Sequence, residues 1–140
     1  MKGRPCKNLR SRPGQAVVEL AVVLPILLIL FIGIINLGIL INSQVILTQA
    51  AWEGARAGAT VDPMEGSGDG AIVGAIRASA SGLSNPNAVT IDVTPPIDER
   101  DRGIGLTVKL HYPLRLSLPI PLDVSLSAEA TSRIEYTRAP

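Results

Sequence analysis

Side chains able to carry out acid–base or nucleophilic chemistry are sparse in this 140-residue sequence. The chain has one histidine, His111, and one cysteine, Cys6. A Ser/His/Asp site would need Asp92 or Asp123 beside His111 and a serine on a strained turn, but the sequence contains no G-x-S-x-G motif. Phosphate-binding and dinucleotide-binding glycine motifs are also missing. We therefore predict no enzymatic activity, no cofactor and no small-molecule substrate.

The acidic residues do not form a pattern that holds a metal ion. Residues 61–70 read VDPMEGSGDG and predict a loop, but their acids lack the alternate spacing and closing Glu of a calcium-binding EF-hand loop. A lone cysteine forms neither an intramolecular disulfide nor a thiolate metal cluster. The charged run at 98–102, DERDR, is expected to be a solvated loop whose charges neutralise each other. No metal site is predicted.

One carboxylate occupies an unusual position, directly before a long apolar run. No charged residue lies between Glu19 and Glu53, and residues 20–41 are apolar except for Asn36. At about 1.5 Å per residue, this run reaches roughly the 30 Å thickness of a bilayer core. The sequence therefore predicts a membrane-spanning helix that begins at about Gln15.

The basic residues predict the orientation of this helix. Five of the thirteen Lys and Arg residues lie in the first 14 residues, namely Lys2, Arg4, Lys7, Arg10 and Arg12. The positive-inside rule keeps such a segment in the cytoplasm. The remaining chain has eight Lys and Arg against twelve Asp and Glu, so nucleic acid is not an expected partner. We predict a single-pass protein of the cytoplasmic membrane with its N-terminus inside and its C-terminal domain outside.

The residues at this junction have a characteristic order: a basic leader, Gly14, four residues, and Glu19. This order resembles that of a type IV prepilin. The resemblance implies that a prepilin peptidase cuts between Gly14 and Gln15, and that Glu19 pairs with the N-terminal amine of an adjoining subunit. A carboxylate at the edge of the hydrocarbon is costly unless it is paired. The residues alone also permit a simpler interpretation, an interfacial charge favoured by the helix dipole.

Four stretches of sequence extend the resemblance to a specific family. They are GQAVVELAVVLP at 14–25, AWEGARAG at 51–58, VKLHYP at 108–113 and LSAEATSRIE at 126–135. Together they are similar to the TadE-like family, the minor pilins or pseudopilins of the tight adherence pilus system. This implies a non-catalytic subunit in the assembly of a Flp-type pilus, with other pilus subunits, the assembly platform and the prepilin peptidase as partners. The alternative is an uncleaved, membrane-anchored binding module or adhesin, and an enzyme that uses His111 is the weakest hypothesis.

Within the predicted span, Pro25 predicts a local kink or unwinding of the helix. Gly33 and Gly38 would allow a neighbouring helix to approach closely, and the Asn36 amide would hydrogen-bond to it. These residues predict contact with a partner helix in the membrane.

The helix pattern continues outside the membrane over residues 42–60. Small residues recur there with helical spacing, as Ala50, Gly54 and Gly58 and as Ala51, Ala55 and Ala59. Such a stripe favours close packing, either on the protein's own sheet or on a partner. Glu53 and Arg56 are expected to pair along the helix, and Trp52 is expected to be an interfacial anchor or a core residue.

Residues 61–140 predict one small α+β domain. Residues 71–83 predict a short amphipathic helix with Ile72, Ile76 and Leu83 facing inward. Period-two alternation predicts strands at 89–94, 106–112 and 124–136, and residues 113–121 predict an irregular linker. The expected chain organisation is a leader at 1–14, a transmembrane helix at 15–41, a helix extension at 42–60, and an antiparallel sheet of three to four strands with the short helix on one face.

Overall fold

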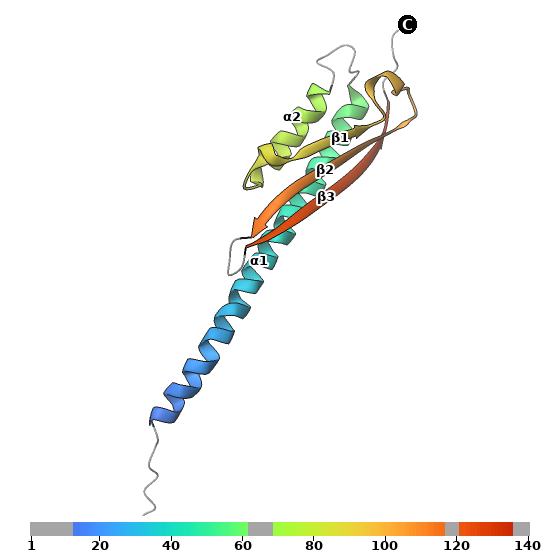
Figure 1. The fold of residues 1–140 in the computed structure, drawn as a ribbon. Coiled ribbons are helices and arrows are strands. Elements are labelled where there is room, and N and C mark those ends of the chain that lie inside the picture. Colours follow the sequence, from blue (N-terminus) through green and yellow to red (C-terminus); the bar gives the residue numbers. More distant parts are fainter. Residues whose placement is uncertain (1–12, 62–68, 117–120, 136–140) are drawn as a thin grey trace, which may run out of the picture.

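A computed structural model of the chain describes residues 13–61, 69–116 and 121–135. Three predicted features lie outside these ranges: the basic leader up to Arg12 with Cys6, most of the loop at 61–70, and Tyr136. The described elements are two α-helices and one three-stranded antiparallel sheet (Figure 1). This confirms the α+β prediction.

A single helix, α1 (Pro13–Thr60), forms both the predicted span and its extension. It begins two residues before Gln15, because proline is well tolerated in the first helical turn, where its missing N–H has no helical partner. The helix also continues through Pro25, so the predicted local unwinding is wrong. Proline removes one backbone hydrogen bond, and the intact turns on both sides preserve the helix.

The second helix, α2 (Gly70–Ser79), lies alongside the outer half of α1 (Figure 1). Its side chains Ile72 and Ile76 are buried, and a 3-10 turn at Ala80–Gly82 follows it before the buried Leu83. The predicted amphipathic helix and its three inward residues are confirmed.

The sheet has the order β1-β2-β3, with β1 (Thr90–Thr94), β2 (Gly105–Leu116) and β3 (Leu122–Arg133). Alternate residues of β2 and β3 are buried against the helices, and the intervening residues are mostly exposed. The buried side chains are Leu106, Val108, Leu110, Tyr112, Leu114, Leu116, Leu126, Ala128 and Ala130. Both helices therefore lie on one face of the sheet, and the other face is polar.

The β2 strand is longer than the sequence predicts, because it continues through Pro113 to Leu116. The predicted irregular linker at 113–121 is therefore wrong for its first four residues. The pairing of β1 with β2 ends at His111, so Pro113 has a strand neighbour only on the β3 side, where it lies opposite Ser125. Proline is tolerated at such an open edge because no N–H is needed there.

The small-residue stripe of α1 packs on this chain's own elements. A Cβ atom added to Gly54 would lie 2.6 Å from Cγ1 of Ile76, and one added to Gly58 would meet Leu106 and lie 2.6 Å from Cδ1 of Ile72. These glycines thus let α2 and β2 approach the α1 backbone. Of the two alternatives for the stripe, the structure shows packing within the chain.

The charged run at 98–102 contains one buried residue, Arg100, whose side chain is 2% exposed. Its Nη1 donates to Oδ1 of Asp69, and its Nε donates to the backbone oxygen of Pro95 at 2.9 Å. The predicted solvated loop is therefore wrong at Arg100. Burial is possible because a carboxylate 31 residues earlier neutralises the guanidinium.

We expect Gly58→Ala to destabilise the outward domain. The added methyl must displace Leu106 and Ile72 in a packed core, which costs about 1–3 kcal/mol. The matched control is Gly74→Ala in α2, which has open space around it and should gain up to about 1 kcal/mol from helix propensity. Denaturant unfolding of the full chain in detergent, followed by circular dichroism, measures both. Equal stability of the two variants would contradict the packing described here.

We expect Asp69→Asn to destabilise the protein by about 1–3 kcal/mol, because the buried guanidinium of Arg100 would lose its charged acceptor. The control is Asp123→Asn, which breaks the ion pair with Arg115 at 2.9 Å. The side chains of Asp123 and Arg115 are both highly exposed, at 74% and 84%. That substitution should change stability by less than about 1 kcal/mol. The unfolding free energies of the two variants are each compared with that of the wild-type protein. A smaller loss of stability for Asp69→Asn than for Asp123→Asn would contradict this prediction.

Candidate functional site

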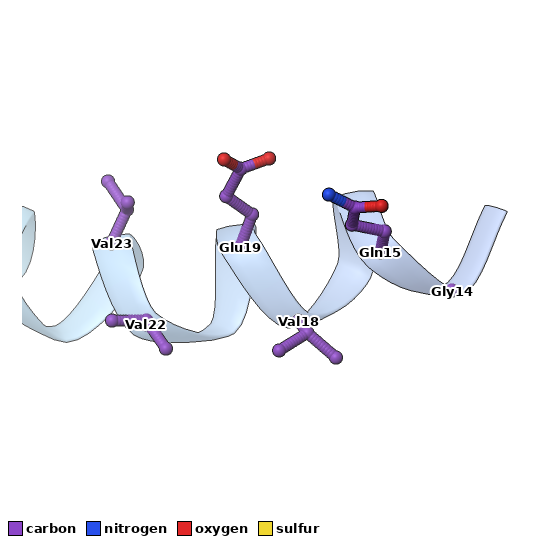
Figure 2. A pocket seen from close by; sticks show the side chains of 6 residues that line it. All are labelled: Gly14, Gln15, Val18, Glu19, Val22 and Val23. Atoms are coloured by element: carbon purple, nitrogen blue, oxygen red, sulfur yellow. The ribbon is translucent and has the colours of Figure 1, made fainter. Parts of the chain in front are cut away.

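The candidate site is the beginning of α1, where Gly14, Gln15 and Glu19 lie within two helical turns. Figure 2 shows Gln15, Glu19 and Val23 on the same side of the helix, with the Glu19 carboxylate pointing away from the helix axis. This arrangement follows from their spacing, because residues four apart share one side of an α-helix. The structure therefore brings together the residues predicted for cleavage and for subunit pairing.

The Glu19 carboxylate is exposed and has no hydrogen bond or ion pair among residues 13–61, 69–116 and 121–135. Glu19 is the seventh residue of α1, and the first turn of this helix contains no acid. Stabilisation by the helix dipole is concentrated in the first turn. The dipole therefore gives Glu19 little stabilisation, and its pairing with another subunit stays a prediction.

Gly14 has no structural requirement for glycine within the described fold. A Cβ atom added to it would meet nothing within 4 Å, and its φ angle is not positive. The Gly14–Gln15 peptide bond lies in the first turn of α1, at the exposed end of the helix. This bond is thus open to another protein, and only one turn of helix has to unwind to extend it.

The apolar side chains that follow Glu19 are uncovered. Large apolar residues between Val17 and Ile41 are mostly 43–66% exposed. Within the described residues, α1 is the one helix that is long and apolar enough to cross a membrane, and none of its most apolar window is buried. A core helix of a soluble domain would be covered by its own chain, so α1 is compatible with a single-pass membrane anchor.

The predicted helix-packing residues fall into two environments. Gly33 and Gly38 have open space around them, so another helix can approach there. Asn36 is half-buried and already has an interaction partner within the chain. Gly54 and Gly58 are buried against α2 and β2, as described above. Contact of Asn36 with another subunit stays a prediction, whereas Gly54 and Gly58 pack within this chain.

An exposed apolar surface that the sequence analysis missed lies on α1 just beyond the span. Ile41, Val45 and Trp52 are 48–56% exposed and line a shallow groove. The remaining groove residues are Leu40, Gln44, Thr48 and Gln49. Trp52 is therefore not a core residue of this chain. The sequence contains the pattern that predicts this surface. Val45 follows Ile41 by four residues and Trp52 follows Val45 by seven, and these spacings place the three side chains on one helix face.

Two predicted charge arrangements can be compared with the structure. Glu53 and Arg56 are both exposed and form no ion pair with each other, because such a pair at the helix surface is weak in water.

On the polar face of the sheet, His111 lies opposite Thr90 and Ser127, whereas Asp92 and Asp123 lie opposite Lys109 and Arg115. Neither of these carboxylates is a direct cross-strand neighbour of the histidine. The described residues contain no group of three metal-ligating side chains.

Comparison with known proteins gives a family match that covers this site. The family model described as TadE-like protein matches residues 14–56. No curated protein and no solved structure matches the chain. The matched segment starts at Gly14 and includes Gln15, Glu19, the whole apolar span and the groove beyond it. The resemblance seen in the sequence is thus confirmed for its first two stretches as far as residue 56, and over residues 14–56 this chain matches the TadE-like family.

Proposed function

We propose that this protein is a non-catalytic TadE-like minor pilin or pseudopilin that is processed after Gly14 and takes part in assembly of a tight adherence pilus. Before processing it lies in the cytoplasmic membrane with its leader inside and its domain outside. Its partners are the prepilin peptidase, other pilus subunits and the assembly platform. The observation that carries the proposal is Glu19, an exposed carboxylate with no partner among the described residues, at the start of an uncovered apolar helix.

Cleavage after Gly14 supplies the missing partner for such a carboxylate. It makes Gln15 the first residue and creates an α-amino group, whose reference pKa of about 7.7–8.0 leaves it largely protonated at neutral pH. Glu19 then lies one helical turn beyond its own N-terminus. In a membrane, a carboxylate and an amine from adjoining subunits neutralise each other, and both avoid the cost of an unpaired charge in lipid. The processed chain is thereby favoured in an assembly over an isolated subunit.

The groove formed by Ile41, Val45 and Trp52 supports a continued subunit contact above the membrane. Trp52 follows Ile41 by eleven residues, which is about 16 Å along a helix. The headgroup layer on each side of a bilayer is only about 5–8 Å thick, so lipid does not reach this tryptophan. A neighbouring subunit that packs against α1 in the membrane would cover the groove as well.

We expect the full chain, expressed with its prepilin peptidase, to lose the mass of residues 1–14 and to begin at Gln15. Gly14→Val should abolish this loss, because a branched side chain obstructs the backbone at the cleavage site. Gly38→Val is the matched control, since Gly38 is equally open and lies in the same helix. Intact mass and N-terminal sequencing measure the result. A chain that still begins at Met1 in the presence of the peptidase would support the uncleaved anchored module instead.

We expect Glu19→Gln to leave cleavage and folding unchanged and to weaken co-assembly. The carboxylate has no partner among the described residues of its own chain, so its loss should not lower the unfolding temperature in detergent. Loss of a buried ion pair of about 3 kcal/mol corresponds to roughly a hundredfold weaker association. Quantitative co-purification of pilus components from native membranes measures this loss.

The matched control for that experiment is Glu53→Gln, which removes an exposed charge from the outer half of the same helix. Its recovery of pilus components should remain within about twofold of the wild-type protein, since an exposed charge contributes little to binding. Equal effects of the two substitutions would show that Glu19 has no special role in assembly.

A further inference from the structure

The end of the sheet nearest the N-terminus of α1 lies beside the helix where the predicted span ends. Figure 1 shows the joined ends of β2 and β3 next to the middle of α1, with β3 rising along the helix from there. Two contacts fix this position. The Gln44 side chain donates from Nε2 to the backbone oxygen of Ser127 at 2.9 Å, and Leu40 and Val124 both pack against the edge of the core.

These contacts set the height of the strand ends relative to the bilayer. Gln44 follows Ile41, the last residue of the predicted span, by three residues, or about 4.5 Å of helix. From Ser127 back to Leu122, β3 descends five residues, or at most about 16 Å. Leu122 therefore lies between about 5 Å outside the hydrocarbon boundary and about 11 Å inside it. The interface between headgroups and acyl chains falls within this interval.

The side chains at this end of the sheet have the polarity that such an interface requires. Leu122 is 57% exposed and belongs to the same side of β3 as Leu126, which packs in the core facing the helices. On the opposite side, Arg115 and Asp123 are highly exposed and form an ion pair at 2.9 Å. An exposed apolar side chain and a charged pair thus lie at the same height, and both are satisfied where acyl chains meet headgroups.

We propose that this end of the sheet, formed by Arg115, Leu116, Leu122 and Asp123, contacts the outer surface of the bilayer, with the Leu122 side chain inserted among the lipids. Residues 117–120 lie outside the described part of the chain and are not included in the site. The proposed occupant is lipid because this end of the sheet lies beside α1 near Gln44, three residues beyond the uncovered apolar run that ends at Ile41. The sheet then gives the protein a second membrane contact, which restricts the tilt of its outward domain.

The proposal rests on the proposed membrane span and is tested with spin labels on the full chain. In a Cys6→Ser background, Leu122→Cys is labelled with a nitroxide and reconstituted, at one protein per vesicle, into phosphatidylethanolamine and phosphatidylglycerol liposomes. Thr131→Cys, exposed and about 30 Å further along the same strand, is the aqueous control. Leu28→Cys, in the middle of the apolar run, is the bilayer control. Unfolding temperatures verify that each variant is folded.

The measured quantity is the ratio of collision with oxygen, which concentrates in the bilayer, to collision with a water-soluble nickel chelate. We expect a ratio at Leu122→Cys that is severalfold higher than at Thr131→Cys and lower than at Leu28→Cys. A ratio equal to that of Thr131→Cys overturns the lipid contact while the span stands. If the label at Leu122→Cys is protected from both reagents, protein covers this position, and the lipid contact is overturned as well. An aqueous ratio at Leu28→Cys refutes the span itself, which separates failure of the proposed function from failure of this inference.

Discussion

A carboxylate without a partner among the described residues, at the start of an apolar helix, is the constraint on which the proposed assembly depends. Glu19 is followed by more than twenty residues without a charge, and the described chain offers it no partner. Water satisfies such a group only while the helix end is hydrated. Once the helix is in lipid, the carboxylate favours a state in which a cation of another molecule lies beside it. In the proposed function, this cation is the N-terminal amine of an adjoining subunit.

The length and continuity of α1 connect this requirement to the outward domain. One unbroken helix runs from Pro13 to Thr60, so a neighbour that fixes its first turns also positions its outer half. That outer half is joined to the domain by Gly54 and Gly58, which admit α2 and β2 to the helix backbone. The domain therefore cannot change its orientation relative to this part of the helix without losing core contacts.

Periodicity in the sequence predicted most of this fold, and it failed where long-range neighbours decide the outcome. The inward residues Ile72 and Ile76 were predictable because a short amphipathic helix needs only its own spacing. Arg100 was not, since its burial depends on Asp69, which is 31 residues away in sequence. The strand through Pro113 was missed for a similar reason: proline is excluded from a central strand, and only the short pairing of β1 leaves an open edge there. At the candidate site, the motif predicted Gly14, Gln15 and Glu19, whereas the exposure of Trp52 and Leu122 depends on which faces the domain leaves uncovered.

The most direct measurement of the central claim is chemical coupling of Glu19 to its partner within native membranes. A membrane-permeant carbodiimide forms an amide bond between a carboxylate and an amine that are in contact, and mass spectrometry identifies the two joined peptides. The account predicts a product in which the Glu19 side chain is linked to the α-amino group of a processed subunit N-terminus. A Glu19 peptide that remains uncoupled in assembled material, or that is joined only to a lysine side chain, would contradict it.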